Sequence, residues 1–205
     1  MNKRLISSVT ILAVFVIGTC VLSIDRADAQ NAIPFTHIVI DPSPPNQSHC
    51  KAVVDIDGDG YPDVLVAGAK GGAGFFWYRY PNWTKYTIVP PGTGFTTDMQ
   101  VGDVDGDGDL DAIIPKGWTK GNSVFWYENP RPSGDPATDT WIEHSIGVAP
   151  SHDVEVGDIN NDGKLDVVVR DGPTTVFIQN TPTTWTKNVI NSRSIEGTSL
   201  GDIDG

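Results

Sequence analysis

Asp103-Val-Asp-Gly-Asp-Gly-Asp-Leu-Asp111, followed directly by the apolar run Ala112-Ile-Ile114, is the stretch of sequence that decides the fold. The same nine-residue pattern occurs at residues 55–63 and 158–166, and a fourth copy begins at Asp202. The starts of the four copies lie 48, 55 and 44 residues apart. Self-similarity at a spacing of about 50 residues indicates a repeat architecture.

The residues around each copy repeat as well, and they predict four short strands per repeat. An apolar or alternating run comes before the acidic segment; a β-branched run, a turn, an aromatic run and a last strand follow it. The aromatic runs are Phe75–Tyr78, Val124–Tyr127 and Val176–Ile178. Four strands in about 45 residues is the size of a propeller blade, so we expect an all-β propeller of four-stranded blades.

The aromatic runs have two interpretations. We expect them to form the core between neighbouring sheets, because they alternate with strand-forming apolar residues. The alternative is that Trp77 or Trp126 is exposed and stacks on a sugar ring.

Each acidic segment has the side chains of a calcium loop. Positions 1, 3, 5 and 9 carry side-chain oxygens, position 6 is a glycine that permits a sharp turn, and position 7 would add its backbone carbonyl. No histidine or cysteine lies within a loop, which disfavours zinc and copper. The predicted ligands are Asp55, Asp57, Asp59, Tyr61 and Asp63; Asp103, Asp105, Asp107, Asp109 and Asp111; Asp158, Asn160, Asp162, Lys164 and Asp166; and Asp202 and Asp204 in the fourth copy.

Other classes of acidic loop were considered. Asp-Gly favours turns by itself, so the segments could be acidic surface turns without a metal, but three copies with ligands in the same phase favour a cation. An EF-hand or a dockerin requires a helix after the loop, and an EF-hand also requires glutamate at position 12. That position is Val66, Ile114 or Val169, in β-branched runs, which excludes both families.

An apolar strand, the D-x-D-G-D-G-x-x-D loop and a second strand such as Asp63–Ala69 together resemble the FG-GAP or VCBS repeat. The resemblance extends over residues 35–205 and implies an integrin α-like β-propeller, with about three complete blades of a seven-bladed ring. It also implies structural Ca²⁺, about one ion per complete repeat, in the hairpin between the first two strands of a blade. The third loop departs from the pattern with Asn160 for aspartate and Asn161 for glycine.

The N-terminus predicts export. Residues 1–29 have a short positive start, an apolar stretch from Val9 to Leu22 and an Ala27-Asp-Ala29 cleavage signal, which is the layout of a secretory signal peptide. An uncleaved anchor is the alternative, but the apolar run is marginal for a bilayer. We expect a secreted or cell-surface protein without membrane insertion after cleavage. The repeat domain would span residues 30–205 and be incomplete at its C-terminus.

Charge and cysteine content indicate which class of partner and which kind of cross-link this protein lacks. The formal net charge of −12 argues against a nucleic-acid partner. Cys50 is the only cysteine after the signal segment, so no disulfide can close within residues 30–205, and a small buried residue is expected there.

A second group of polar residues is expected at the end of each blade opposite the calcium loop. His49 and His152 lie six residues before a loop, about 20 Å along an extended strand. Asp153 follows His152, and the turns between second and third strands bring Lys70, Lys116, Trp118 and Arg170 to the same end. Ordinary polar rim residues are the plainer interpretation.

Three functions are compatible with this pattern. The first is a binding module for an extracellular glycan or protein. The second is a carbohydrate-active enzyme, a lyase or sugar dehydratase, with His49, His152 and Asp153 as acid, base or metal ligands. The third is a structural spacer. The sequence contains no nucleophile elbow and no nucleotide loop, which favours binding.

The first segment after the signal predicts how the ring closes. Phe35 and Ile40 have the same spacing as Trp83 and Ile88 in the last strand of a blade. No first, second or third strand comes before residue 35, so we expect its partners to be C-terminal blades of the same chain. Without them, the strand at 35–40 would be loosely held and the chain prone to association.

Overall fold

The computed structural model describes residues 35–69, 72–117, 123–195 and 197–203. The predicted signal peptide, Lys70, Trp118 and Asp204 therefore lie outside the described residues. Residues from Val39 onward form one compact unit, and residues up to Ile38 belong to a separate one. No helix among the described residues is long and apolar enough to cross a membrane.

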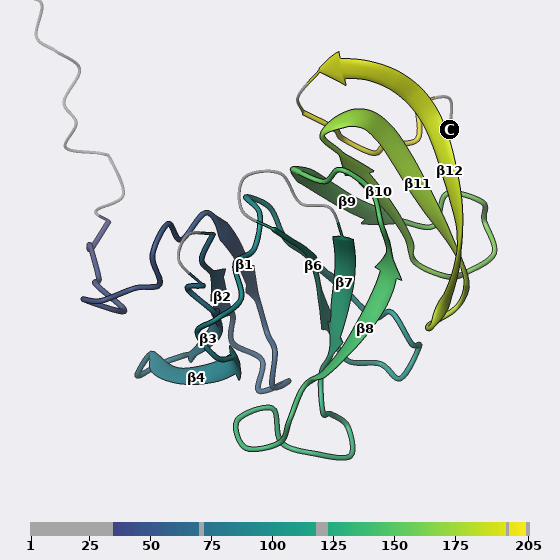
Figure 1. The fold of residues 1–205 in the computed structure, drawn as a ribbon. Helices are drawn as coiled ribbons and strands as arrows, with labels where there is room; N and C mark the ends of the chain where they lie inside the picture. Colours follow the sequence, from purple (N-terminus) through teal and green to yellow (C-terminus); the bar gives the residue numbers. More distant parts are fainter. Residues whose placement is uncertain (1–34, 70–71, 118–122, 196, 204–205) are drawn as a thin grey trace, which may run out of the picture. The chain divides into compact units, whose positions relative to one another are not determined.

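The described residues are all-β and contain three four-stranded antiparallel sheets, each with its strands in chain order (Figure 1). Sheet 1 consists of β1 (Cys50–Val54), β2 (Asp63–Ala67), β3 (Phe75–Arg79) and β4 (Thr84–Val89). Sheet 2 consists of β5 (Gln100–Gly102), β6 (Asp111–Lys116), β7 (Ser123–Glu128) and β8 (Ile142–Gly147). Sheet 3 consists of β9 (Asp153–Gly157), β10 (Asp166–Arg170), β11 (Gly172–Thr181) and β12 (Thr184–Ile195). This confirms the predicted class and the four-stranded repeat.

Each acidic loop connects the first and second strands of its sheet. The strand pairs closest to the loops are Val54 with Asp63, Gly102 with Asp111, and Gly157 with Asp166. Every loop therefore starts directly after a paired strand and ends on a residue of the next strand. This register gives the three loops the same relation to their sheets.

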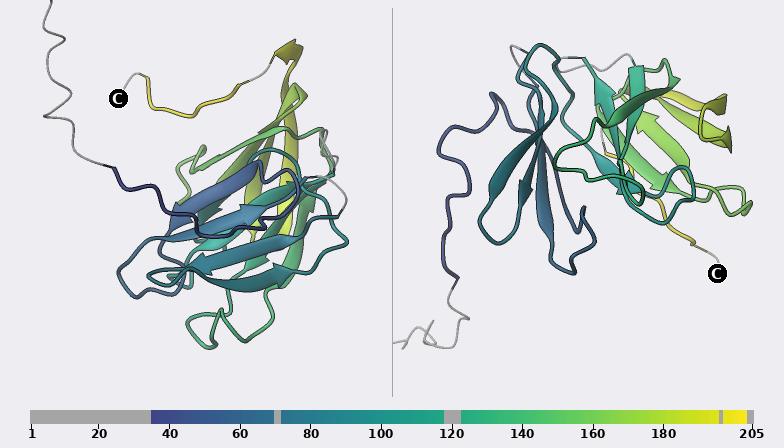
Figure 2. Two further views of the ribbon diagram at one scale, coloured as in Figure 1. Left: turned by 90° about the vertical axis from the view of Figure 1, so that its left-hand side faces the viewer. Right: turned by 90° about the horizontal axis from the view of Figure 1, so that it is seen from below.

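The apolar core lies between successive sheets, which pack face to face (Figure 2). Phe75 and Trp77 of sheet 1 share one cluster with Ile114 and Tyr127 of sheet 2. A second cluster joins sheets 2 and 3 through Trp126 and other residues, including Val124, Val167 and Phe177. Trp77 and Trp126 are 0% and 1% exposed, so the aromatic runs are inter-sheet core and these two rings are not free to stack on a sugar.

Sheet 2 differs from its neighbours in the connection between its third and fourth strands. This connection runs from residue 129 to 141, whereas residues 80–83 and 182–183 make the corresponding turns in sheets 1 and 3. Ala137 and Trp141 of the longer connection pack into the cluster between sheets 1 and 2. The extra length covers the core at the loop end of that interface.

Two predicted strands are not formed. Residues 35–40 make no strand, and Phe35 is 95% exposed. None of the strands in the described part of the chain pairs with this segment. Ile40 packs against Val66, Phe76 and Tyr78, on the face of sheet 1 away from sheet 2. The run at residues 199–201, which resembles a first strand, is also not in a strand.

Candidate metal centre and the opposite end of the sheets

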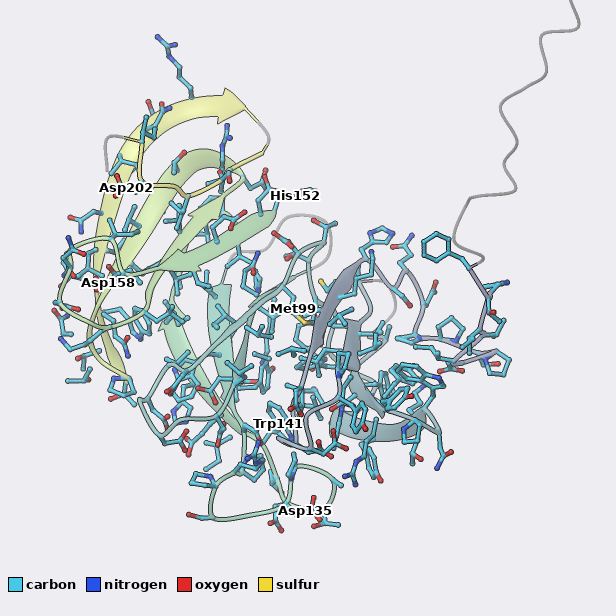
Figure 3. All side chains as sticks on the ribbon, turned by 180° about the vertical axis from the view of Figure 1, so that it is seen from behind. Met99, Asp135, Trp141, His152, Asp158 and Asp202 are labelled. Carbon is cyan, nitrogen blue, oxygen red and sulfur yellow. The ribbon has the colours of Figure 1, made fainter. Side chains whose placement is uncertain are left out.

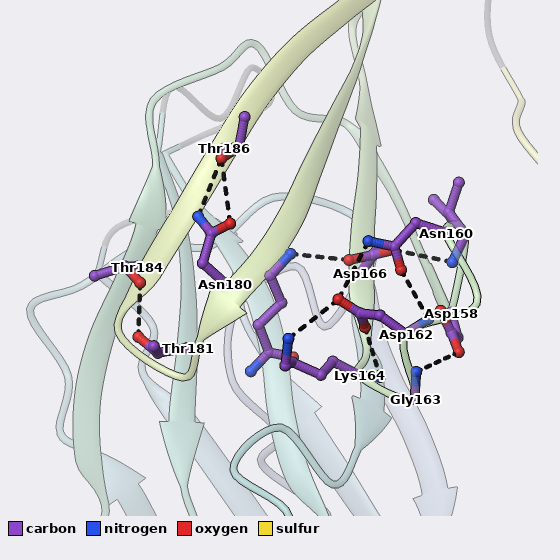
Figure 4. A network of polar contacts seen from close by, with 12 residues as sticks. Asp158, Asn160, Asp162, Gly163, Lys164, Asp166, Asn180, Thr181, Thr184 and Thr186 are labelled. Carbon is purple, nitrogen blue, oxygen red and sulfur yellow. Dashed lines mark hydrogen bonds and ion pairs between the residues drawn. The ribbon is translucent and has the colours of Figure 1, made fainter.

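The first aspartate of each loop organises the loop backbone. Oδ1 of Asp103 accepts hydrogen bonds from the N–H groups of Gly106 and Asp107, and its Oδ2 accepts one from Gly108. Asp55 makes the equivalent three bonds in loop 1, and Asp158 makes two of them in loop 3 (Figure 4). The loops are therefore wrapped around a carboxylate at position 1.

Positions 4 and 6 of the loops need a left-handed backbone. Position 6 is glycine in all three loops, with φ of 89°, 95° and 82° at Gly60, Gly108 and Gly163. Position 4 has φ of 72° at Gly58, 82° at Gly106 and 60° at Asn161. Asparagine tolerates this region better than other residues with a Cβ. The third loop thus keeps the backbone of the other two despite its departure at Asn161.

The aspartate at position 9 is buried and fully bonded to the backbone. Oδ2 of Asp111 accepts the N–H of Val104 at 2.9 Å, and Oδ1 accepts the N–H of Asn129 at 2.9 Å. The same two bonds occur at Asp63 and Asp166, from the N–H of loop position 2 and from the N–H of a residue at or near the end of the third strand, Tyr80 or Gln179. This carboxylate ties three segments of one sheet together, in addition to any role toward a cation.

Three carboxylates converge in loops 1 and 2. Ligand atoms of Asp55, Asp57 and Asp63 lie within 4.8 Å of one another, and so do those of Asp103, Asp105 and Asp111. These are positions 1, 3 and 9. Loop 3 has the same hydrogen-bond scheme, with Asn160 at position 3. The geometry therefore brings together three of the four predicted side-chain positions.

The predicted ligand at position 5 has another role in the structure. Asp59, Asp107 and Asp162 each accept the N–H of the residue at position 7, at 2.9, 3.2 and 3.0 Å. Position 7 itself varies, since Tyr61 is 56% exposed whereas the Asp109 side chain is buried. Neither oxygen of Asp109 has a hydrogen-bond partner among the described residues.

Burial and neighbouring charge make loop 2 unfavourable for bare carboxylates. Burial raises the pKa of Asp111 to about 8, although two backbone N–H groups oppose the rise. Burial, followed by the charge of Asp107, raises the pKa of Asp109 to about 7. A cation in the loop would relieve this penalty, because it stabilises the ionised form.

The donor set fits a hard divalent cation. All converging atoms are oxygens, and Asp109 supplies an orphaned buried carboxylate in the same loop as one triad. In loop 3, Oδ1 of Asn160 is an amide oxygen, which is also a calcium ligand type. The residues present therefore fit Ca²⁺, which would supply positive charge between the carboxylates.

Loops 1 and 2 are each also bonded to the next sheet. Nδ2 of Asn129, in sheet 2, donates to the carbonyl of Ile56 in loop 1 at 3.0 Å. Nε2 of Gln179, in sheet 3, donates to the carbonyl of Val104 in loop 2 at 2.7 Å. Asn129 directly follows β7, Gln179 lies near the end of β11, and both carbonyls belong to loop position 2. Sequence reasoning missed these contacts, because sheet 1 has Tyr80 at this position and the amide therefore does not recur in every repeat.

At the opposite end, His152 and Asp153 begin sheet 3, and Figure 3 shows His152 well away from Asp158 at the other end of β9. Nδ1 of His152 lies 2.8 Å from Oδ1 of Asp153, whose Oδ2 accepts the N–H of Gly197 at 2.9 Å. The hydroxyl of Thr97 donates to the carbonyl of His152 at 3.1 Å. These contacts join the starts of neighbouring repeats.

The other residues predicted for this end differ in their burial and in their contacts. Lys116 pairs with Glu143 and lies over the ring of Phe125. Arg170 is 4% exposed and donates from Nη1 to the carbonyl of Gly197, while its Nε and Nη2 have no partner among the described residues. His49 is exposed and belongs to none of the metal-binding clusters found among the described residues.

Asp202, in the fourth copy of the motif, lies at the loop end of sheet 3. It lines a half-open cavity of about 640 Å³ together with Gly157, Asp158, Ile159 and Leu200. The cavity separates loop 3 from the start of the next copy. Asp202 is therefore placed beside a loop of the same kind, as the repeat spacing predicts.

Comparison with known protein families decides the type of repeat. Residues 55–114 match the FG-GAP-like repeat. This FG-GAP-like segment begins at position 1 of loop 1 and ends in β6, so it contains both acidic triads. It confirms the resemblance inferred from the loops over residues 55–114. No curated protein matches the chain.

Proposed function

We propose that this chain is an extracellular β-propeller-type module, braced by calcium, that binds a glycan or protein ligand. The observation that carries the proposal is the position of the acidic triads. Loops 1 and 2 each hold three converging carboxylates, and each is joined through its position 2 carbonyl to the following sheet. A cation in the loop would fix this carbonyl and so stabilise the junction between two sheets.

The FG-GAP-like repeat supports the location. Such repeats are typical of extracellular proteins, and residues 1–29 have the pattern of a cleaved signal. An exported chain that has no disulfide within residues 30–205 gains from another cross-link that forms only in the folded state. Calcium in the loops would supply that cross-link.

The ligand is proposed to bind at the opposite end of the sheets. The buried Arg170 has two guanidinium N–H groups without partners among the described residues, and His152, Asp153 and Asp98 lie at the same end. Donors and acceptors that converge beside a partly exposed imidazole suit hydroxyl or carboxylate groups of a glycan or of a protein. Further blades of the same chain are proposed as partners of the outer sheet faces.

The enzyme alternative rests on the 2.8 Å contact between His152 and Asp153, because a carboxylate beside an imidazole orients a general base. The two proposals are separated by assay. Glycan-array binding without turnover supports the binding module, and turnover of uronic or keto sugars supports the enzyme. His152→Ala is expected to reduce either activity while leaving calcium binding intact.

Calcium bracing is tested by thermal unfolding of the full chain. Excess chelator is expected to lower Tm and calcium to restore it, since a ligand of the folded state stabilises by about 2.7 kcal/mol at a hundredfold excess over Kd. Magnesium should restore less, because it demands a smaller and more regular octahedral shell. An unchanged melting curve in chelator would refute calcium bracing.

A further inference from the structure

The third strands of the three sheets carry different residues at one equivalent position. Arg79, Glu128 and Ile178 occupy the same register, because each directly precedes the residue whose N–H bonds the position 9 aspartate. The same strand position is therefore cationic in sheet 1, anionic in sheet 2 and apolar in sheet 3.

Arg79 is bound to the acidic triad of loop 1. Its Nε lies 2.5 Å from Oδ2 of Asp57, and its Nη2 lies 3.6 Å from Oδ2 of Asp59. The other oxygen of Asp57 accepts the N–H of Asp59 at 3.2 Å. A cation that enters loop 1 must therefore compete with the guanidinium for Oδ2 of Asp57.

Glu128 gives loop 2 the opposite charge at this position. Like Arg79 in sheet 1, it directly precedes the residue whose N–H bonds the position 9 aspartate. Its carboxylate lies 2.7 Å from Nε2 of His144. Loop 2 also carries a fifth carboxylate, Asp109, that the other two loops lack.

We propose that the residue at this strand position sets the cation affinity of the adjacent loop, so that loop 2, beside Glu128, binds calcium more tightly than loop 1, whose Asp57 is held by Arg79. The inference rests on the proposed function, since it concerns the same loops. It assigns Arg79 and Glu128, which lie outside the ligand motif, as the residues that determine affinity. Extra negative charge strengthens, and a competing cation weakens, the binding of a divalent ion.

The test is a calcium titration of the full chain, followed by nuclear magnetic resonance of the backbone amides. Gly60 and Gly108 report loops 1 and 2 separately, because each donates its N–H to the position 1 aspartate of its own loop. In the wild type, the Gly108 signal is expected to shift at a lower calcium concentration than the Gly60 signal. Arg79→Ile, which installs the residue of sheet 3, should lower the Gly60 midpoint about tenfold and leave Gly108 unchanged.

Two further variants separate a local effect from net charge. Glu128→Gln should raise the Gly108 midpoint by about three- to tenfold. Arg193→Ile makes the same charge change as Arg79→Ile at an exposed position on β12, and it should move neither midpoint by more than about twofold. Arg79 is 42% exposed, so its replacement is compatible with folding.

The titrations distinguish a failure of calcium bracing from a failure of the assignment of Arg79. If neither glycine responds to calcium in the wild type, the calcium bracing of the proposed function is wrong. If both respond but Arg79→Ile behaves like Arg193→Ile, the loops bind calcium and the assignment of Arg79 is refuted. A Gly60 midpoint below that of Gly108 in the wild type would also overturn the proposed order.

Discussion

The two ends of the sheets differ in how regularly their hydrogen bonds repeat from one sheet to the next. At the loop end, the position 9 aspartates Asp63, Asp111 and Asp166 make matching backbone bonds in all three sheets. At the opposite end, Cys50 donates its thiol to the carbonyl of Thr96, whereas Asp98 accepts the N–H of Val154. The loop end therefore carries the fold, and the opposite end is free to differ between repeats.

The largest expected effect is the loss of a position 9 aspartate. Asp166→Ala removes the acceptor of the Ile159 and Gln179 N–H groups at a site that is 0% exposed. We expect the free energy of unfolding to fall by about 3 kcal/mol, measured by urea denaturation in chelator so that calcium does not contribute. Asp139→Ala, at an exposed carboxylate, is the control and should cost much less. Equal losses would show that the loop end is not special.

The next effect concerns pH in the calcium-free protein. The pKa values of Asp109 and Asp111 are raised to about 7 and about 8, above that of an unfolded aspartate, so the folded state binds more protons between pH 4 and 8. Stability therefore falls as pH rises through this window, by at most about 4 kcal/mol between pH 6 and 9. Melting in chelator at several pH values measures this. Calcium should remove the trend, because the ion takes the place of the protons; a fall in stability toward pH 6 in chelator would contradict the prediction.

A smaller effect is expected for the hydrogen bond between sheets 2 and 3 at the opposite end. Asp98→Ala removes the acceptor of the Val154 N–H at a half-buried position. The expected cost is about 1 kcal/mol in the same urea assay, less than at Asp166, because water can replace the lost partner. A loss as large as that of Asp166→Ala would show that both ends carry the fold equally.

The smallest effect on stability is expected at His152. Its side chain is 35% exposed and its ring contacts Asp153, a surface contact that contributes little to folding. His152→Ala should change the free energy of unfolding by less than about 0.5 kcal/mol. A much larger destabilisation would make His152 a structural residue and weaken its assignment to a ligand site.

Sequence was sufficient wherever the contacts are local. The nine-residue loops, their glycines and the strands beside them follow from turn chemistry and alternation within a few residues, as in the Asp103–Asp111 segment. Contacts between sheets were not predicted. The bond from Asn129 reaches Ile56 across 73 residues, and one amide gives no periodic signal. Similarly, the burial of Asp109 distinguishes it from Tyr61 and Lys164 only once the fold is known.

An amide side chain at or near the end of the third strand bonds a sheet to the sheet before it in the sequence, and this gives the order of the sheets a direction. Asn129 and Gln179 each reach back to the loop before them, so a sheet with such an amide is suited to follow another sheet. Sheet 1 has Tyr80 at this position, and its ring stacks on Tyr61 of its own loop at 5.3 Å. A sheet that packs against sheet 1 on the side away from sheet 2 would therefore do so without this amide-to-carbonyl hydrogen bond. A designed protein with more sheets would be extended by copying the repeat of sheet 2, which carries Asn129. The repeat of sheet 1, which carries Tyr80, would remain the first one.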